Sequence, residues 1–248
     1  MIDLEWSARV ARVTLNRPPV NAMSAEWVAR FHSILDQLAE RDDWSVLHLR
    51  SAQKLWSAGA DLRQLEVNFK LDIEQQLDLG RSYQRLFQRL QDVPAITVAE
   101  IGGTALGGGL ELALSCDLRI ASSRAKFGFP EVTLGLIPGA GGTQRLSWLC
   151  GRPVASRLIL TGQIVDGAEA HRLGLVQWVH EHDAVAAQAE LLVEQCAALP
   201  RHATAGAKAA IFAASDPSQD GFLRETEVVR DCLQSAATRE LVAAFLRR

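Results

Sequence analysis

The segment Gly102-Gly-Thr-Ala-Leu-Gly-Gly-Gly-Leu-Glu111 places five glycines within ten residues, between two apolar runs. Ile96–Ala99 before it predicts a buried strand, and Leu110–Cys116 at its end predicts a helix. Glycines directly before a helix leave N–H groups free at its N-terminus, whose partial positive charge stabilises an oxyanion. Glu111 falls in the first turn, where an acid either serves chemistry or simply complements the helix dipole.

Acidic residues are sparse around this segment. Eleven of the 18 glycines lie between positions 102 and 151, and residues 101–160 hold only three acids, Glu111, Asp117 and Glu131. Glu131 follows Phe127-Gly-Phe-Pro130, so it is either a helix N-terminal residue or a carboxyl in an apolar pocket. In such a pocket desolvation raises the pKa of a glutamate and lets it hold a proton near neutral pH. We expect a purely structural role for Asp117.

A second group of small residues lies earlier in the chain, in Trp56-Ser-Ala-Gly-Ala-Asp-Leu62. Small side chains after a strand let the backbone turn sharply and let a ligand approach the main chain. Asp61 is placed to cap a short helix running through Leu65. The alternative is an ordinary turn without a ligand.

The rest of the chain predicts an α/β core followed by helices alone. Alternating or apolar runs predict strands at Ile2–Trp6 and Ala11–Leu15 (a hairpin), Val46–Arg50, Leu118–Ala121 and Leu175–Val179. Helical spacing marks residues 24–40, with Ser24 as N-cap, and residues 72–91. After Asp183 only helices are expected, at Ala184–Leu199, Ala203–Ala214, Gly221–Cys232 and Thr238–Arg247. We therefore predict an α/β core over residues 1–182 and a C-terminal helical lobe over residues 183–248.

Composition excludes several classes of function. The 248 residues carry a net charge of −3, so there is no basic footprint for nucleic acid, and no run of ~18 apolar residues predicts a membrane span. The N-terminus lacks signal-peptide features, and four widely spaced cysteines favour reduced thiols, so we expect a soluble cytoplasmic protein. Dinucleotide, P-loop and nucleophile-elbow motifs are missing from the sequence. His180-Glu-His-Asp183 favours a solvated loop over a metal site.

Five segments together resemble the crotonase superfamily, and specifically the enoyl-CoA hydratases. They are Asn16-Arg-Pro-Pro-Val-Asn-Ala22, Ser57–Leu62, Gly107–Glu111, Pro130-Glu131 and Pro138–Leu146. The resemblance implies a crotonase-like spiral ββα core that carries the helical lobe. It also implies hydration of trans-2-enoyl-CoA to 3-hydroxyacyl-CoA, a step of fatty-acid β-oxidation or of related acyl-CoA degradation.

The resemblance implies a role for each matching residue. The backbone N–H groups of Ala60 and Gly108 would form an oxyanion hole for the thioester oxygen. Glu111 would deprotonate the water that attacks C3, and Glu131 would give a proton to C2. Retention of both acids favours a hydratase over an isomerase, which generally needs only the acid at the Glu131 position.

Substrate contacts and assembly are also implied by the resemblance. Contacts to coenzyme A or substrate are expected from Ala58, Asp61, Leu62, Arg63, Gly139, Phe245 and Arg248. The last two would reach the coenzyme from an adjacent subunit of a trimer or a dimer of trimers. Leu65, Phe69 and Leu71 favour an apolar acyl pocket. No metal and no cofactor beyond the substrate's own coenzyme A is expected.

Three alternatives remain open. The first is an isomerase or another crotonase reaction, such as methylglutaconyl-CoA hydration or decarboxylation of a branched acyl-CoA. The second is RNA binding, reported for some relatives, although the helix from Ser24 carries only Arg30 against Glu26, Asp36 and Glu40. The third is a non-catalytic family member, which the presence of both glutamates argues against.

Overall fold

A six-stranded sheet forms the centre of the computed structural model, which describes residues 1–247. Its strand order is β1 (Ile2–Ser7), β2 (Val10–Leu15), β3 (Val46–Ser51), β4 (Ile96–Ile101), β6 (Leu118–Ser122) and β9 (Trp178–His180). Only the β1–β2 hairpin is antiparallel, and every later pair is parallel. The middle strands are apolar because helices cover both of their faces.

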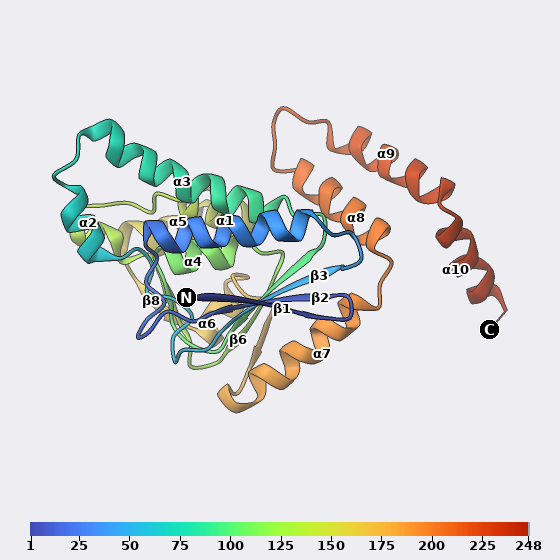
Figure 1. Ribbon diagram of the computed structural model, residues 1–248, viewed down its shortest axis with the longest axis horizontal. Helices are drawn as coiled ribbons and strands as arrows, with labels where there is room; N and C mark the ends of the chain where they lie inside the picture. Colours follow the sequence, from blue (N-terminus) through green and yellow to red (C-terminus); the bar gives the residue numbers. More distant parts are fainter. Residues whose placement is uncertain (248) are drawn as a thin grey trace.

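Helices on one face of the sheet build the main core. They are α1 (Ala25–Ala39), α3 (Ile73–Gln91), α4 (Gly108–Leu114) and α5 (Gly142–Thr161), and α1 and α3 run side by side (Figure 1). Ser24 caps α1 by accepting a hydrogen bond from Trp27 N. The opposite face is covered by α7 (Val185–Ala197), whose Val185, Ala189 and Val193 are buried. The sheet is thus a layer between two helical layers.

Three loops lie together at one edge of this sheet, and their residues form the site described below. The strands β3, β4 and β6 are parallel neighbours, so the loops that follow their carboxyl ends lie together. These loops lead into α2 (Leu62–Asn68), α4 and the 3₁₀ helix η1 (Pro130–Leu134). A small sheet of β5 (Ala105–Leu106), β7 (Lys126–Gly128) and β8 (Ile164–Asp166) ties the second and third loops together.

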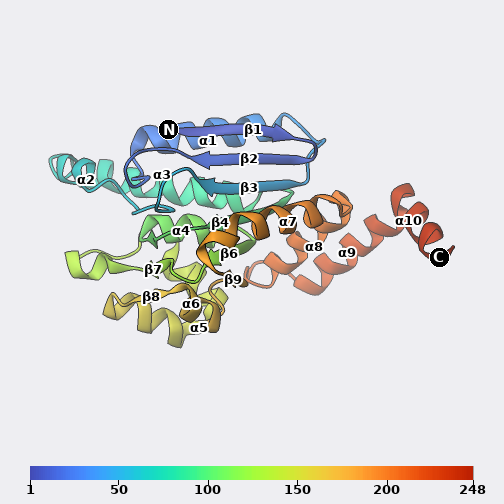
Figure 2. The same cartoon turned by 90° about the horizontal axis from the view of Figure 1, so that it is seen from below.

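The C-terminal lobe extends away from the sheet. It consists of α8 (Arg201–Ala213), α9 (Gly221–Gln234) and α10 (Ala236–Leu246), and α10 lies farthest from the core (Figures 1 and 2). Lys208 of α8 anchors the lobe, because its Nζ lies 2.9 Å from Asp117 Oδ2 and donates to Ala95 O. Asp117 therefore has the structural role expected of it.

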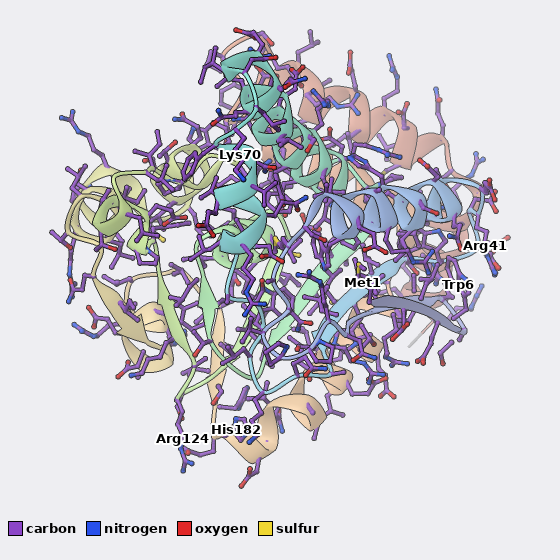
Figure 3. The ribbon with its side chains drawn as sticks, turned by 60° about the vertical axis from the view of Figure 1, so that its left-hand side comes forward. Met1, Trp6, Arg41, Lys70, Arg124 and His182 are labelled. Atoms are coloured by element: carbon purple, nitrogen blue, oxygen red, sulfur yellow. The ribbon has the colours of Figure 1, made fainter. Side chains whose placement is uncertain are left out.

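The far end of the hairpin is held by aromatic and cationic side chains. The guanidinium of Arg41 lies 4.2 Å from the ring centre of Trp6, and both residues lie at one edge of the molecule (Figure 3). Trp44 packs edge-on against Trp6, and its Nε1 donates to Leu38 O. Such cation–π and edge contacts fix the hairpin against the end of α1.

The α/β core with a helical C-terminal tail is confirmed, with local differences. α4 begins at Gly108 rather than Leu110, and α2 extends to Asn68 rather than Leu65. β9 begins at Trp178, because the N–H of Leu175 closes the turn after α6 (Gly167–Arg172) by donating to Ala170 O. The boundary at residues 182/183 stays a prediction. The four cysteines are free.

Candidate active site

The loops after β3 and β4 are joined backbone to backbone. Ser57 N donates to Thr104 O (3.2 Å), and Leu106 N donates to Ser57 O (3.1 Å). The indole Nε1 of Trp56, which is fully buried, donates to Gly109 O at 2.9 Å. These bonds fix the first turn of α4 relative to the loop before α2.

Two glycines permit this close approach. Gly59 has a φ of +92°, and a Cβ placed on it would lie 2.9 Å from both Gly108 N and Leu106 O. Gly107 has a φ of +52°, and a Cβ there would lie 2.9 Å from Glu131 Oε1. The positive φ favours glycine at both positions. At Gly59 a side chain would also clash with backbone atoms, and at Gly107 it would push against the Glu131 carboxyl.

Two backbone N–H groups lie next to each other at this junction. Met23 N donates to Gly59 O and Asp61 N donates to Met23 O, which leaves the N–H of Ala60 on the other side of the chain. Gly108 is the first residue of α4, so its N–H has no acceptor within the helix. Neither N–H donates to a protein acceptor within residues 1–247. A Cβ on Gly108 would lie 3.5 Å from Ala60 N, so the two donors are close enough to serve one oxygen atom.

Glu111 lies in the first turn of α4 with only 3 % of its surface exposed. Its Oε1 accepts the N–H of Ala140 at 2.7 Å and the N–H of Gly142 at 2.8 Å. Burial raises the pKa of Glu111 to about 7, and the charge of Glu131 adds to the rise, while the two N–H bonds oppose it. The carboxyl is therefore held in place and titrates near neutrality.

Glu131 approaches the same space from η1. The helix begins with Pro130, and Leu136 N donates to Glu131 O at 3.0 Å, which fixes the backbone. Its Oε2 is buried and has no hydrogen-bond partner among the described residues. Burial raises the pKa of this carboxyl also. Glu131 is thus both a helix N-terminal residue and a carboxyl in a desolvated pocket, the two interpretations that the sequence left open.

The two glutamates and the two free N–H groups open onto one cavity of about 400 Å³. Its walls come from the loop before α2, from α2, α3 and α4, and from residues 130–140. The lining is mostly apolar, from Met23, Leu62, Leu65, Leu79, Tyr83, Leu134, Leu136 and Ile137. An apolar cavity with a few convergent polar groups is typical of a small-molecule site.

Most of the predicted site residues come together in this cavity. Ala58, Ala60, Asp61, Leu62, Gly108, Glu111, Glu131 and Gly139 all line it. Asp61 is engaged structurally, because its carboxylate caps α2 and lies 2.9 Å from Arg17 Nη2. The Arg17 guanidinium holds the pKa of Asp61 below its usual range. Asp61 is therefore a support for the loop that carries Ala60.

Other predicted residues lie elsewhere. Arg63 is exposed and does not line the cavity. Phe245 does not line it either, since it belongs to α10, which lies at the opposite end of the molecule from α2 (Figure 1). Arg248 lies outside the described residues. The predicted lining by Leu65 is confirmed, whereas the predicted lining by Phe69 and Leu71 is wrong, because both side chains face solvent.

Sequence reasoning missed the contribution of α3 to the cavity. Gln76, Leu79, Gly80 and Tyr83 line it from one face of that helix. Their helical spacing indicates that they share one face of the helix, but it does not show what that face packs against. Tyr83 also supports the site, because its hydroxyl donates to Met23 O at 2.9 Å and its burial raises its pKa to about 12.

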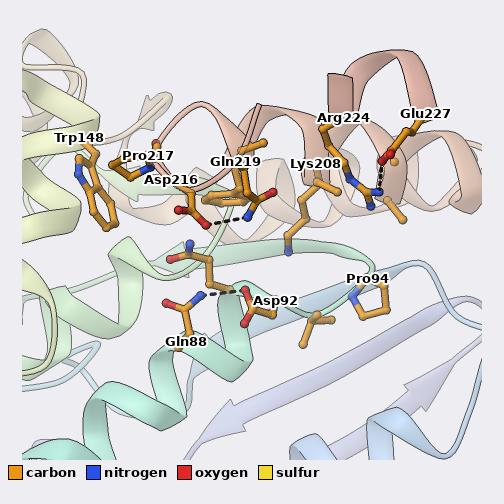
Figure 4. Close-up of a pocket in the computed structure, with 18 residues that line it drawn as sticks. Gln88, Asp92, Pro94, Trp148, Lys208, Asp216, Pro217, Gln219, Arg224 and Glu227 are labelled. Carbon is orange, nitrogen blue, oxygen red and sulfur yellow. Dashed lines mark hydrogen bonds and ion pairs between the residues drawn. The ribbon is translucent and has the colours of Figure 1, made fainter. Parts of the chain in front are cut away.

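A larger cavity of about 1050 Å³ lies between α3, α5 and the lobe (Figure 4). Its charged residues are paired with neighbours, as in Arg224 with Glu227 and Asp216 with Gln219. Neither active-site glutamate lines it. The smaller cavity is therefore the candidate active site.

Comparison with known proteins agrees with this geometry. The family model described as enoyl-CoA hydratase/isomerase matches residues 5–248. The chain belongs to the enoyl-CoA hydratase/isomerase family. The short-chain-enoyl-CoA hydratase of Clostridium acetobutylicum is 34 % identical over 250 residues, covering 100 % of this chain and 95 % of the relative.

Solved structures agree with the family assignment. An enoyl-CoA hydratase from Bacillus anthracis superposes with a TM-score of 0.91 at 32 % identity, over 99 % of this chain and 96 % of that one. DspI from Pseudomonas aeruginosa superposes with a TM-score of 0.93 at 34 % identity, over 99 % of this chain and 94 % of that one. The predicted crotonase fold of this family member is thereby confirmed.

Among residues 1–247, no helix is both long enough and apolar enough to cross a membrane. The same residues contain no group of three or more His, Cys, Asp or Glu side chains placed to hold a metal ion.

Proposed function

We propose that this protein hydrates trans-2-enoyl-CoA to 3-hydroxyacyl-CoA. The observation that carries the proposal is the convergence of two carboxyls, one buried and one partly buried, and two free N–H groups on one apolar cavity. Each group matches one demand of the reaction. The charge that develops on the thioester oxygen needs donors, and addition of water needs a base and an acid.

The N–H groups of Ala60 and Gly108 would bind the thioester oxygen. As water attacks C3, electron density moves through C2 to this oxygen, and the two donors stabilise the resulting enolate. Both groups are fixed by the loop bonds at Ser57 and by the α4 helix, so they need no rearrangement during the reaction. In other enzymes one such donor contributes on the order of 3–4 kcal/mol.

Glu111 and Glu131 would divide the proton transfers between them. Two carboxyls that share one site resist ionising together, which favours a state in which one of them carries a proton. The two N–H bonds to Glu111 favour the carboxylate there, whereas Oε2 of Glu131 has no donor and favours the protonated form. Glu111 takes a proton from water as the O–C3 bond forms, and Glu131 delivers its proton to C2 on the same face. The reaction draws on no group beyond these and the substrate's own coenzyme.

The coenzyme would be held around Ala58 and Arg63, with Leu62 and Gly139 at the cavity wall. The exposed guanidinium of Arg63 follows directly on the oxyanion loop and is free to meet a phosphate. Phe245 and Arg248 would reach the coenzyme from a neighbouring subunit.

A trimer, or a dimer of trimers, would bring that neighbour into place. The helices α9 and α10 bury no residue, and they expose Phe222, Leu223, Val229, Leu233, Leu241, Val242, Phe245 and Leu246. So many exposed apolar side chains on two neighbouring helices are typical of an oligomer interface. Sedimentation equilibrium tests this part, and a monomer at micromolar concentration would contradict it.

The activity itself is tested with purified protein and a panel of enoyl thioesters. Crotonyl-, hexenoyl-, octenoyl- and decenoyl-CoA are each followed by loss of the conjugated thioester absorbance, with 3-hydroxyacyl-CoA identified by mass spectrometry. A 3-enoyl-CoA arm detects isomerisation, in which absorbance appears instead. Turnover of the 2-enoyl substrates supports the proposal, whereas isomerisation without hydration replaces it.

A further inference from the structure

Arg145 is a buried cation beside the active site that the proposed chemistry does not use. It lies near the start of α5 with 8 % of its surface exposed. Its Nε donates to Gln91 Oε1 at 2.8 Å, its Nη2 to Gln88 Oε1 at 3.3 Å and its Nη1 to Ala140 O at 3.1 Å. All three acceptors are uncharged, so Arg145 is not held there by an ion pair with any of them.

The third of these bonds reaches the loop that binds Glu111. Ala140 O accepts from Arg145, while Ala140 N donates to Glu111 Oε1 at 2.7 Å and Gly142 N donates to the same oxygen at 2.8 Å. A Cβ on Gly141 would lie only 2.1 Å from Nη1, so the guanidinium packs directly on this loop. The backbone N–H of Arg145 also donates to Gly141 O at 2.9 Å. Arg145 thus bonds the two carbonyls, of Ala140 and Gly141, that lie between the two Glu111 donors in the chain.

We propose that Arg145 is a positioning residue for Glu111: it holds residues 140–142 so that both N–H groups stay on Oε1, and it places a positive charge near that carboxyl. The inference rests on the proposed function, because it assigns Arg145 to the base of the hydration step. The guanidinium does not touch the substrate cavity, since Arg145 is not among its lining residues.

Arg145 interacts electrostatically with a small set of ionisable groups. Glu111 faces Glu131 from η1 and Arg145 from α5, and Arg145 in turn faces Asp92 after α3 and Cys116 after α4. Arg145 lowers the pKa of Glu111, opposing the effects of burial and Glu131. Loss of the cation therefore moves the pKa of Glu111 upward and leaves less of the base ionised at neutral pH.

Lysine does not reproduce this arrangement. The planar guanidinium reaches three acceptors on two different elements at once, whereas an ammonium concentrates its donors at one point. Two of the acceptors, Gln88 and Gln91, belong to α3 and line the larger cavity, where Gln88 donates to Asp92 (Figure 4). The bonds to α3 thus hold the Arg145 guanidinium at the angle that meets Ala140.

The test compares Arg145→Gln and Arg145→Lys with Arg157→Gln. Arg157 lies on the same helix but is exposed and pairs with Glu169, away from the cavity, so it controls for loss of a charge on α5. We expect Arg145→Gln to lower kcat by about 10- to 100-fold, as a small misplacement of a catalytic group does, with KM nearly unchanged. The acidic limb of the pH profile should move to higher pH in Arg145→Gln and less in Arg145→Lys, and Arg157→Gln should match wild type.

A second readout does not depend on turnover. Carbon-detected NMR titration of the Glu111 carboxyl, assigned by its loss in Glu111→Gln, should give a higher pKa in Arg145→Gln than in wild type. If Arg145→Gln fails to fold, Gln91→Met removes the 2.8 Å acceptor and should shift the same titration in the same direction. An unchanged titration and pH profile in folded variants overturns the inference. A wild type that hydrates no enoyl-CoA overturns the proposed function instead, while the titration still tests Arg145.

Discussion

The sheet core and the C-terminal lobe differ in how far they bury their large side chains. The core buries three whole tryptophans, Trp27, Trp44 and Trp56, and even encloses charged Glu111, Arg119 and Arg145. The lobe helices α9 and α10 bury no residue, and Phe222 and Phe245 are 86 % and 74 % exposed. One chain therefore builds the cavity by itself, whereas α9 and α10 leave apolar side chains exposed, as expected if the proposed oligomer covers them.

Substitution of either cavity glutamate should remove most of the activity and leave the lobe unchanged. Glu111→Gln and Glu131→Gln should each lower kcat by a factor on the order of 10² to 10⁴, because each removes an acid–base group. The oligomeric mass should stay that of wild type. Steady-state kinetics and light scattering check both points, with Glu66→Gln on the exposed face of α2 as a matched control. A near-normal rate in Glu111→Gln would mean that another group activates water.

A backbone change in the core should have the next largest effect. Gly59→Ala introduces a Cβ 2.9 Å from Gly108 N at a φ of +92°, so the two loops must separate and misplace the donor pair. We expect a loss of about 10²- to 10³-fold in kcat, comparable to removal of one oxyanion donor. Gly135→Ala is the matched control, since Gly135 also has a positive φ but has open space around its Cβ position. Equal losses in both variants would show that strain alone, and not the loop contact, is responsible.

The lobe is tested by making its apolar surface polar. Phe222→Lys combined with Phe245→Lys should weaken assembly by about 1.5–3 kcal/mol for each side chain that is buried in the interface. Analytical ultracentrifugation over a concentration series should show a shift toward monomer. Circular dichroism of the core should be retained, because neither phenylalanine packs on the sheet. Unchanged assembly would contradict the assignment of α9 and α10 to the interface.

Replacing Glu111 should also have a smaller effect: the Glu111→Gln variant should be more stable than wild type, by an amount that depends on pH. The pKa of Glu111 is raised from 4.5 to about 7 in the folded protein, so the fold binds its proton more tightly than the unfolded chain does. Stability therefore falls as pH rises from about 4.5 to 7, and Glu111→Gln removes this loss. The variant should be more stable than wild type by on the order of 1–3 kcal/mol at pH 8, and by less at pH 5. Urea unfolding at the two pH values measures the difference, and an equal gain at both would contradict the sign.

Much of the core could be predicted because its signals are local. Ser24 and Asp61 were recognised as caps from the residues that follow them, and both cap helices in the structure. The strands β5, β7 and β8 were missed, because two or three residues carry no periodicity and owe their form to pairing with distant chain. The helix α5 was missed because Gly151 and Pro153 interrupt its pattern.

The site was predicted in part for the same reason. The segments around Ala60, Gly108 and Glu131 carry recognisable motifs, and the fold brings them onto one cavity. The contribution of Tyr83 depends on how α3 packs against residues far away in sequence, which one chain's pattern does not show. Phe69 was expected to line the acyl pocket only because it is hydrophobic. It follows the last turn of α2, and its side chain faces solvent.

The two hydrogen-bond donors of the proposed oxyanion site belong to the main chain, and this affects how the sequence can change during evolution. A side-chain donor disappears with one codon change, whereas the N–H groups of Ala60 and Gly108 persist through almost any substitution except proline. In the proposed mechanism, changes at Glu111 or Glu131 would therefore alter the reaction while the N–H groups proposed to bind the thioester oxygen remain. A lineage carrying this fold could then exchange its acids for new acyl chemistry and still bind the substrate.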